Sequence, residues 1–111
     1  MTIDMNYSQN AVLSIEELEA SILCDPLVLS VRSFKHDDIY VFAVLTTPIY
    51  LKSERDELIK EITDALNAKI NNCNVLVTFN MTVYRNISDD MSQESKIKLI
   101  DLARSDRTIN F

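Results

Sequence analysis

The sequence predicts a single α+β domain, a two-layer sandwich in which helices lie on one face of a three-stranded sheet. The patterned segments follow the order helix, strand, strand, helix, strand (αββαβ), and a C-terminal helix comes after them. A length of 111 residues fits one domain, and 47% apolar with 25% charged residues is typical of a globular protein. We assign residues 13–111 to this domain, and residues 1–12, which are mostly polar, to a flexible N-terminal arm.

The first helix is expected to begin after Ser14. Ser14 and Glu17 have the spacing of a capping box, and Leu13 and Leu18 have the spacing of a hydrophobic staple. The helix should end before Pro26, because the residue that precedes a proline is pushed out of the helical region.

Two strands are expected to pair antiparallel around a polar break at residues 35–38. Residues 27–34 alternate with period two, and the expected apolar face consists of Leu27, Leu29 and Val31. Residues 39–45 are apolar on both faces. This strand is therefore expected in the centre of the sheet, with something packed over each side or with one face held for a partner.

The main amphipathic helix is expected to begin at a Ser53 cap, with an apolar stripe of Leu58, Ile62, Ala65, Leu66 and Ile70. Residues 75–79 read as the third strand, which could continue through Met81, Val83 and Tyr84. Ser92 is expected to cap the last helix, whose apolar residues are Ile97, Leu99, Ile100 and Ala103.

Charge and composition exclude several functions. The net charge is −6, and the 11 basic residues are scattered, whereas polyanion binding needs a basic cluster. We therefore expect neither nucleic acid nor an anionic membrane surface as a partner. The chain has no glycine, which phosphate-binding loops, dinucleotide-binding turns and nucleophile elbows all use. No cofactor is predicted.

The sequence as written predicts a cytoplasmic protein that does not insert into a membrane. No apolar run reaches the roughly 18 residues that cross a bilayer, and the segment after Met1 lacks the features of a signal peptide. Export is expected only if an N-terminal signal has been removed. Cys24 and Cys73 are expected to be buried small hydrophobes, although pairing in an exported protein stays open. Their spacing predicts no zinc site.

No residue carries a clear catalytic pattern. His36, the only histidine, lies in a polar turn and is expected to be solvated rather than to act as an acid or base. The acidic pairs Asp37-Asp38 and Asp89-Asp90 are also expected to be solvated turns, since calcium loops need a longer set of oxygens. We predict no catalytic residue and no metal ligand.

Four aromatic residues are the candidate interface. They are Tyr40, Phe42, Tyr50 and Tyr84, and aromatic side chains concentrate at protein interfaces when exposed. A role in the core is the alternative for each of them. The segment from Ile39 to Arg85 contains the two-sided apolar strand and these aromatic residues, and binding is expected there.

Residues 13–88 resemble the YhcN/YlaJ sporulation-lipoprotein family and related αββαβ modules of the BON and ring-building type. The resemblance lies in a helix that leads into DPLVLSV, in the strand DIYVFAVLT, in the helix SERDELIKEITDALNAKI and in the ending NVLVTFNMTVYRNI. It implies a small assembly module associated with sporulation or the envelope. The glycines of such families are missing, and the residues before Cys24 do not form a lipobox, so lipidation is not expected.

A second resemblance is to the C-terminal domain of acyl-adenylating enzymes, through EELEASILCDPLVLSV, YVFAVLT and SKIKLIDLAR. It implies a detached accessory domain with Lys96 as the catalytic lysine. Ser95 stands where that family has glycine, and Lys96 lies inside a predicted helix. The favoured interpretation is a non-enzymatic module that binds a protein partner or self-associates by an edge strand or by its apolar second strand.

Overall fold

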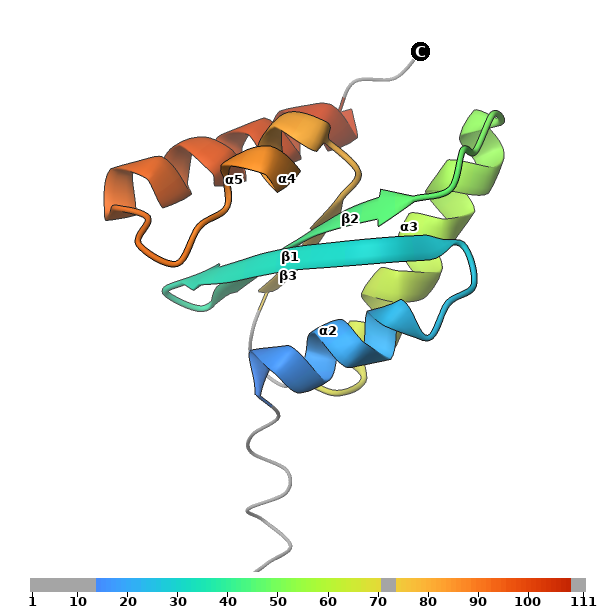
Figure 1. Ribbon diagram of the computed structural model, residues 1–111, viewed down its shortest axis with the longest axis horizontal. Helices are drawn as coiled ribbons and strands as arrows, with labels where there is room; N and C mark the ends of the chain where they lie inside the picture. The colour runs from blue at the N-terminus through green and yellow to red at the C-terminus, as the bar shows by residue number, and fades with distance from the viewer. Residues whose placement is uncertain (1–13, 71–73, 109–111) are drawn as a thin grey trace, which may run out of the picture.

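The computed structural model describes residues 14–70 and 74–108, so the predicted arm at residues 1–12 lies outside it. The chain forms a small α+β fold around a three-stranded sheet, as predicted (Figure 1). The elements in order are α2 (Ile15–Leu23), β1 (Val28–His36), β2 (Ile39–Thr46), α3 (Lys52–Asn67), β3 (Asn74–Thr78), α4 (Met81–Asn86) and α5 (Gln93–Thr108).

The sheet has the strand order β1-β2-β3, with β2 in the centre. β1 and β2 pair antiparallel, as predicted, and β2 and β3 pair parallel because α3 carries the chain back across the sheet. The central position of β2 follows from its composition, since residues 41–44 are buried on both faces. The predicted four-residue break between β1 and β2 is shorter: only Asp37 and Asp38 lie between the strands, and Asp37 has a φ of 55°.

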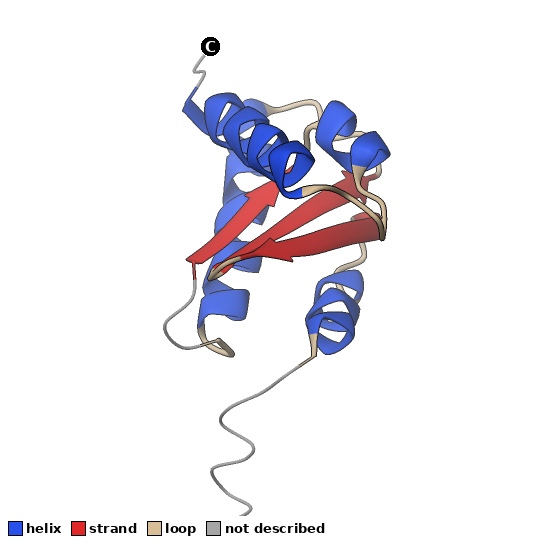
Figure 2. Ribbon diagram, turned by 90° about the vertical axis from the view of Figure 1, so that its left-hand side faces the viewer, coloured by secondary structure: helices blue, strands red, loops and turns tan. Residues whose placement is uncertain are grey.

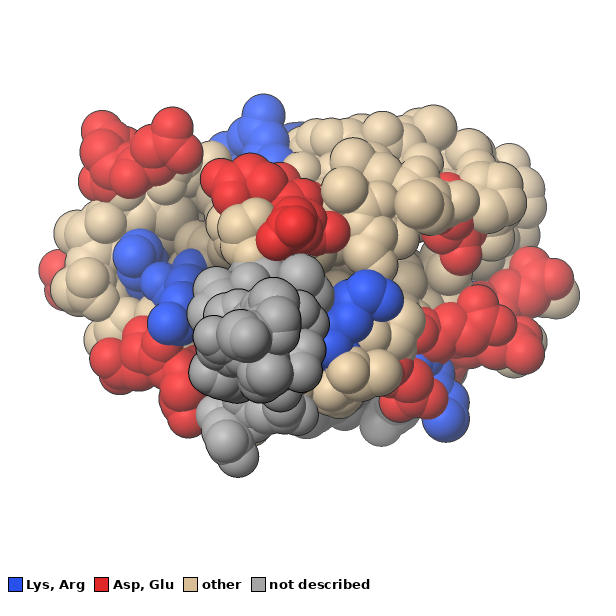
Figure 3. Space-filling model, turned by 90° about the horizontal axis from the view of Figure 1, so that it is seen from below, with Lys and Arg blue, Asp and Glu red and all other residues tan. Residues whose placement is uncertain are grey.

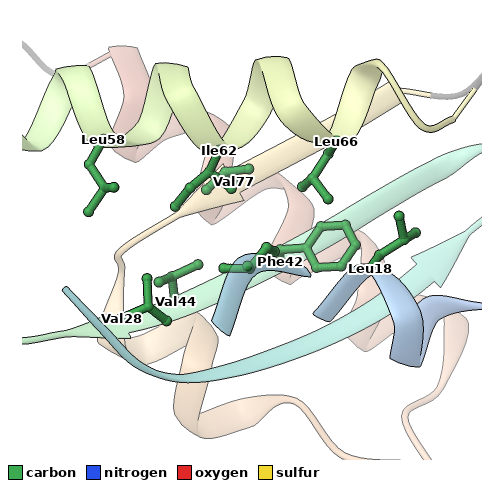
Figure 4. Close-up of a cluster of buried hydrophobic side chains, with 9 residues drawn as sticks. Leu18, Val28, Phe42, Val44, Leu58, Ile62, Leu66 and Val77 are labelled. Atoms are coloured by element: carbon green, nitrogen blue, oxygen red, sulfur yellow. The ribbon is translucent and has the colours of Figure 1, made fainter. Parts of the chain in front are cut away.

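Helices cover both faces of the sheet, so the molecule has three layers rather than the predicted two (Figure 2). On one face, α2 and α3 pack against Phe42 and Val44, with Leu18, Leu58, Ile62 and Leu66 filling the space between (Figure 4). On the other face, α4 and α5 cover Val41 and Ala43. The physical reason is the two-sided apolar pattern of β2, which needs a cover on each side.

A β-bulge changes which residues of β1 are buried. The register of β1 against β2 shifts between Val28 and Ser30. Val28 is therefore buried, whereas Leu27 and Leu29, which were expected on the buried face, are exposed. One extra residue in a strand moves the following side chains to the opposite face, and period-two alternation cannot reveal this.

The third strand ends at Thr78, and the expected continuation through Met81, Val83 and Tyr84 is wrong. These residues lie on the short helix α4. The Asn80 side chain caps it by accepting hydrogen bonds from the N–H groups of Thr82 (2.8 Å) and Val83 (3.1 Å). A local side-chain bond to the backbone thus competes with the strand.

The helix ends agree only in part with the expected caps. Ser14 and Glu17 form the predicted capping box, and Ser92 Oγ accepts a 3.1 Å hydrogen bond from the Ser95 N–H. Ser53 is not the cap of α3, whose N-cap residue is Leu51 and has no side-chain hydrogen bond. Of the stripe expected on α3, Leu58, Ile62 and Leu66 are buried, while Ala65 is exposed. The expected staple residue Leu13 lies outside the described residues.

Candidate functional site

The four candidate interface aromatics do not form one patch. Phe42 is fully buried under α2 and α3, so it belongs to the core. Tyr40 is half-buried and stacks on Phe42, with ring centroids 6.3 Å apart. Tyr84 is half-buried against the opposite face of the sheet. Tyr50 alone is a surface residue, 90% exposed at the entry to α3.

Tyr84 fixes α4 to the outer strand β1. Its hydroxyl donates a 2.7 Å hydrogen bond to Ser30 Oγ. The Arg32 guanidinium lies 4.7 Å from the centroid of the Tyr84 ring and donates a 3.3 Å hydrogen bond to the Tyr84 carbonyl oxygen. These contacts explain Tyr84 as a structural residue.

His36 is less solvated than predicted, because it is the last residue of β1 and only 16% of its side chain is exposed. Its Nε2 lies 3.6 Å from Asp37 Oδ2. Its Nδ1 is buried and has no hydrogen-bond partner among the described residues. Lys96 on α5 lies close to the same turn and donates a 3.2 Å hydrogen bond from Nζ to the Lys35 carbonyl oxygen. The structure thus places the two residues considered for chemistry near one hairpin, and their described contacts are with backbone and turn groups.

The acidic pairs and the cysteines add no metal site within residues 14–70 and 74–108, where no three His, Cys, Asp or Glu side chains gather in a way that could hold an ion. Asp89 and Asp90 are exposed, as expected of a turn. Cys24 is exposed rather than buried, and its thiol donates a 3.5 Å hydrogen bond to the Ala20 carbonyl oxygen. Its exposure follows from its position at the C-cap of α2. Cys73 lies outside the described residues.

β1 begins and β2 ends at the same end of the sheet (Figure 1), and five exposed apolar residues belong to the segments at this end. We call this surface the apolar end. It consists of Leu23, Leu27, Leu29, Tyr50 and Leu51, whose exposed fractions range from 43% to 90%. The Thr47 N–H donates a 2.9 Å hydrogen bond to the Leu27 carbonyl oxygen and so ties the segment after β2 to the start of β1. Figure 3 shows a broad uncharged area on the side where α2 ends and β1 begins.

Sequence reasoning found only Tyr50 of these five residues as a surface candidate. Leu27 and Leu29 were expected to be buried, and the bulge in β1 exposes them. Leu51 and Tyr50 follow Pro48 in the connector, and no periodicity there indicates which side is buried. The sequence therefore contains no simple signal for the apolar end as a whole.

A pocket of about 440 Å³ opens beside the apolar end, at the carboxyl ends of the parallel strands β2 and β3. Its apolar lining comes from Val44, Leu45, Pro48, Ile49, Phe79 and Met81. Its polar lining comes from Thr46, Thr47 and Asn80, and its only ionisable residue is Arg55 on the first turns of α3. We call it the strand-end pocket.

A second hollow of about 370 Å³ lies between α2 and α3. Its floor is apolar, formed by Ile22, Ile62 and Leu66, and Cys24 lies at its rim with Asp25 and Glu61. The acidic rim and the exposed thiol distinguish it from the strand-end pocket, whose one ionisable group is a cation.

The sheet covered by helices on both faces, the apolar end and the strand-end pocket define a small α+β domain with one surface suited to binding. No family model, no curated protein and no solved structure matches the chain. None of the helices within the described part of the chain has the length and apolar character needed to span a membrane.

Proposed function

We propose that this protein is a non-enzymatic protein-interaction module that binds its partner through the apolar end, and that a second copy of the chain is one such partner. The observation that carries the proposal is the exposure of five large apolar side chains on segments at the same end of the sheet, namely the end of α2, the start of β1 and the connector that leads into α3. Exposed apolar surface costs free energy in water, and this cost is removed when a partner covers it.

The size of the surface sets the expected strength of binding. Full burial of one large apolar side chain is worth about 1.5–3 kcal/mol, and these five are already partly covered, so one copy supplies about 4–8 kcal/mol. In a symmetric contact between two copies both sets are buried, which gives about 8–16 kcal/mol. Association itself costs about 4–15 kcal/mol. We therefore expect a transient complex, with a dissociation constant from about micromolar to about millimolar.

The two other routes to self-association are less suitable. β2 is covered on both faces, so its apolar residues are not available in the folded protein. β1 and β3 are the two edge strands. β1 contains a bulge and carries Arg32 and Lys35, and β3 is only five residues long, and these features oppose pairing with another strand. We therefore place the contact on side chains of the apolar end. The association with sporulation or with the envelope that the resemblance implies stays a prediction.

Light scattering on a dilution series tests the proposal. The wild-type protein is expected to show a mean mass that rises with concentration between about 10 µM and about 1 mM. The double variant Leu29→Gln, Tyr50→Gln is expected to remain monomeric over this range. Ile97→Gln is the matched control, because Ile97 is also an exposed apolar residue, at 47%, but lies on α5.

The proposal would be contradicted by a mean mass that is independent of concentration, together with amide signals of the apolar-end residues that do not change when a partner is added. Equal loss of association in the Ile97→Gln control would also contradict it, since that result would mean that general surface hydrophobicity drives the contact.

A further inference from the structure

We propose that the strand-end pocket is a binding site for a carboxylate attached to an apolar group. This inference does not depend on the apolar end being an interface. It is carried by three features of the pocket: its position and size, its apolar walls, and the set of hydrogen-bond donors among its lining residues.

The position and size are those of a ligand site. A volume of about 440 Å³ lies inside the range of about 300–1,000 Å³ that is typical of small-molecule pockets. The pocket lies where β2 and β3, which are parallel and joined by α3, both end. Ligands of sheets built in this way bind outside the carboxyl ends of the strands, because the connecting segments diverge there.

The apolar walls are supported by the core. Val44 is buried in the cluster that joins α2, α3 and the sheet, and Ile49 and Phe79 pack against that cluster. These side chains are held by their neighbours, so the pocket exists before any ligand enters it. Pre-formed walls reduce the entropy lost on binding.

Arg55 is the cation of α3 for which residues 14–70 and 74–108 provide no ion-pair partner. Lys52 and Lys60 each form a 2.8 Å ion pair with the acidic residue four positions later, Asp56 and Asp64. The position four residues after Arg55 is Ile59, and within the described residues no hydrogen bond or ion pair holds the Arg55 guanidinium. In a chain of net charge −6, this leaves one arginine free at a pocket with no acidic lining.

The other polar groups of the pocket are also able to donate. Thr46 and Thr47 line the pocket, and neither hydroxyl has a hydrogen bond within residues 14–70 and 74–108. The Asn80 oxygen is occupied by the cap of α4, and its amide nitrogen stays available. A carboxylate accepts hydrogen bonds only, so this set complements it.

A single arginine favours a carboxylate over a phosphate. The guanidinium donates two parallel hydrogen bonds to one carboxylate, and the charges of the pair then cancel. A phosphate carries more charge and is usually held by several cations or by a glycine-rich backbone loop, and this chain has no glycine. The carboxylate can belong to a free apolar acid or to the last residue of a polypeptide.

Amide chemical-shift titration of the ¹⁵N-labelled full chain tests the proposal. The probes are hexanoate with hexanol as its neutral control, and N-acetyl-leucine with N-acetyl-leucinamide as the same pair in peptide form. We expect both carboxylates to move the amide signals of residues 44–47, 49 and 79–81. We expect the neutral compounds to bind at least about tenfold more weakly, as the loss of a charged hydrogen bond requires. Binding of hexanoate without N-acetyl-leucine would assign the site to free acids, and markedly tighter binding of N-acetyl-leucine than of hexanoate would assign it to a chain end.

Variants separate the pocket from general charge effects. Arg55→Met is expected to weaken carboxylate binding about tenfold or more, while Arg104→Met, a matched change of an exposed arginine on α5, leaves it unchanged. Leu29→Gln is also expected to leave it unchanged, so failure of the interface proposal would not affect this result. Equal binding of hexanoate and hexanol, equal binding to the Arg55→Met variant, or shifts confined to other regions would overturn the proposal.

Discussion

The Tyr84 hydroxyl donates a 2.7 Å hydrogen bond to Ser30 Oγ and so joins two residues that are 54 positions apart in the sequence. Tyr84 lies on α4, a helix of six residues, which is too short to be stable by itself. Ser30 lies on the outer strand β1. The contact, with Arg32 over the same ring, holds α4 on the sheet and thereby also positions Asn80 and Met81 at the strand-end pocket.

Removing this hydroxyl is expected to destabilise the fold moderately. Tyr84→Phe keeps the ring under Arg32 and should lower the free energy of unfolding by about 1 kcal/mol, the usual net value of one hydrogen bond. Urea denaturation measures it. In a double-mutant cycle with Ser30→Ala, the second substitution should add little once the first is present. Fully additive losses would show that the two groups do not interact.

Truncation of Phe42 is expected to destabilise the fold, whereas truncation of Tyr50 is expected to leave its stability nearly unchanged. Both residues were predicted from the sequence as interface residues. Phe42→Ala removes a fully buried ring and should lower the free energy of unfolding by about 3–5 kcal/mol. Tyr50→Ala removes a side chain that is 90% exposed and should change it by less than about 0.5 kcal/mol, while weakening association. Thermal and urea denaturation measure the changes in stability, and dilute samples keep association from contributing to them.

Truncating the cap of α4 is expected to loosen the region around the pocket. Asn80→Ala removes the acceptor for the N–H groups of Thr82 and Val83, and should cost about 1 kcal/mol. Asn80→Asp is the control, because aspartate caps equally well, although its charge should weaken carboxylate binding. Hydrogen exchange at residues 82–84 should become faster in the alanine variant only. Unchanged exchange there would mean that packing of Val83 and Tyr84 alone maintains the helix.

The stability of the fold is expected to depend slightly on pH in the alkaline range, because of the pair Lys60 and Asp64. Asp64 accepts a hydrogen bond from Lys60 and adds its negative charge, and both raise the pKa of Lys60 above its ordinary value of 10.5. A group whose pKa is raised in the folded state contributes its full stabilisation below the ordinary, unfolded-state pKa. This contribution is lost as the pH rises through the folded-state pKa. The pair is exposed, so the effect is small.

The unfolding midpoints of wild type and Asp64→Asn are therefore expected to differ slightly and constantly at neutral pH and to converge above a pH of about 10.5. Glu57→Gln, which changes an exposed acid on the same helix, serves as the control and should show no such convergence. A difference between the two midpoints that grows with pH would contradict the prediction, because loss of the Lys60 charge can only weaken the pair.

The parts of the fold that were predictable are those with strong local patterns. The capping box at Ser14, the stripe of Leu58, Ile62 and Leu66, and the two-sided apolar strand β2 were all legible, and each formed as expected. The number of layers was predicted wrongly, although the pattern of β2 contained the reason for the third layer. A strand that is apolar on both faces needs a helix on each face.

The candidate sites depended on features that sequence periodicity does not encode. A one-residue bulge at Leu29 exposes side chains that alternation placed in the core. A side-chain cap at Asn80 turns an expected strand into a helix and so forms one wall of the strand-end pocket. The sequence shows that Ile59 stands four residues after Arg55, where Lys52 and Lys60 each have an aspartate, but only the folded chain places Arg55 at the pocket.

The most direct test of the central claim is to map the contact surface by recording amide spectra of the wild-type protein at low and at high concentration. We expect concentration-dependent shifts at Leu23, Leu27, Leu29, Tyr50 and Leu51, and none along α5, where Ile97 and Leu102 are also exposed. The Leu29→Gln, Tyr50→Gln double variant should give superimposable spectra at both concentrations. Shifts that map to α5, or the same concentration dependence in the double variant, would contradict the assignment of the apolar end as the interface.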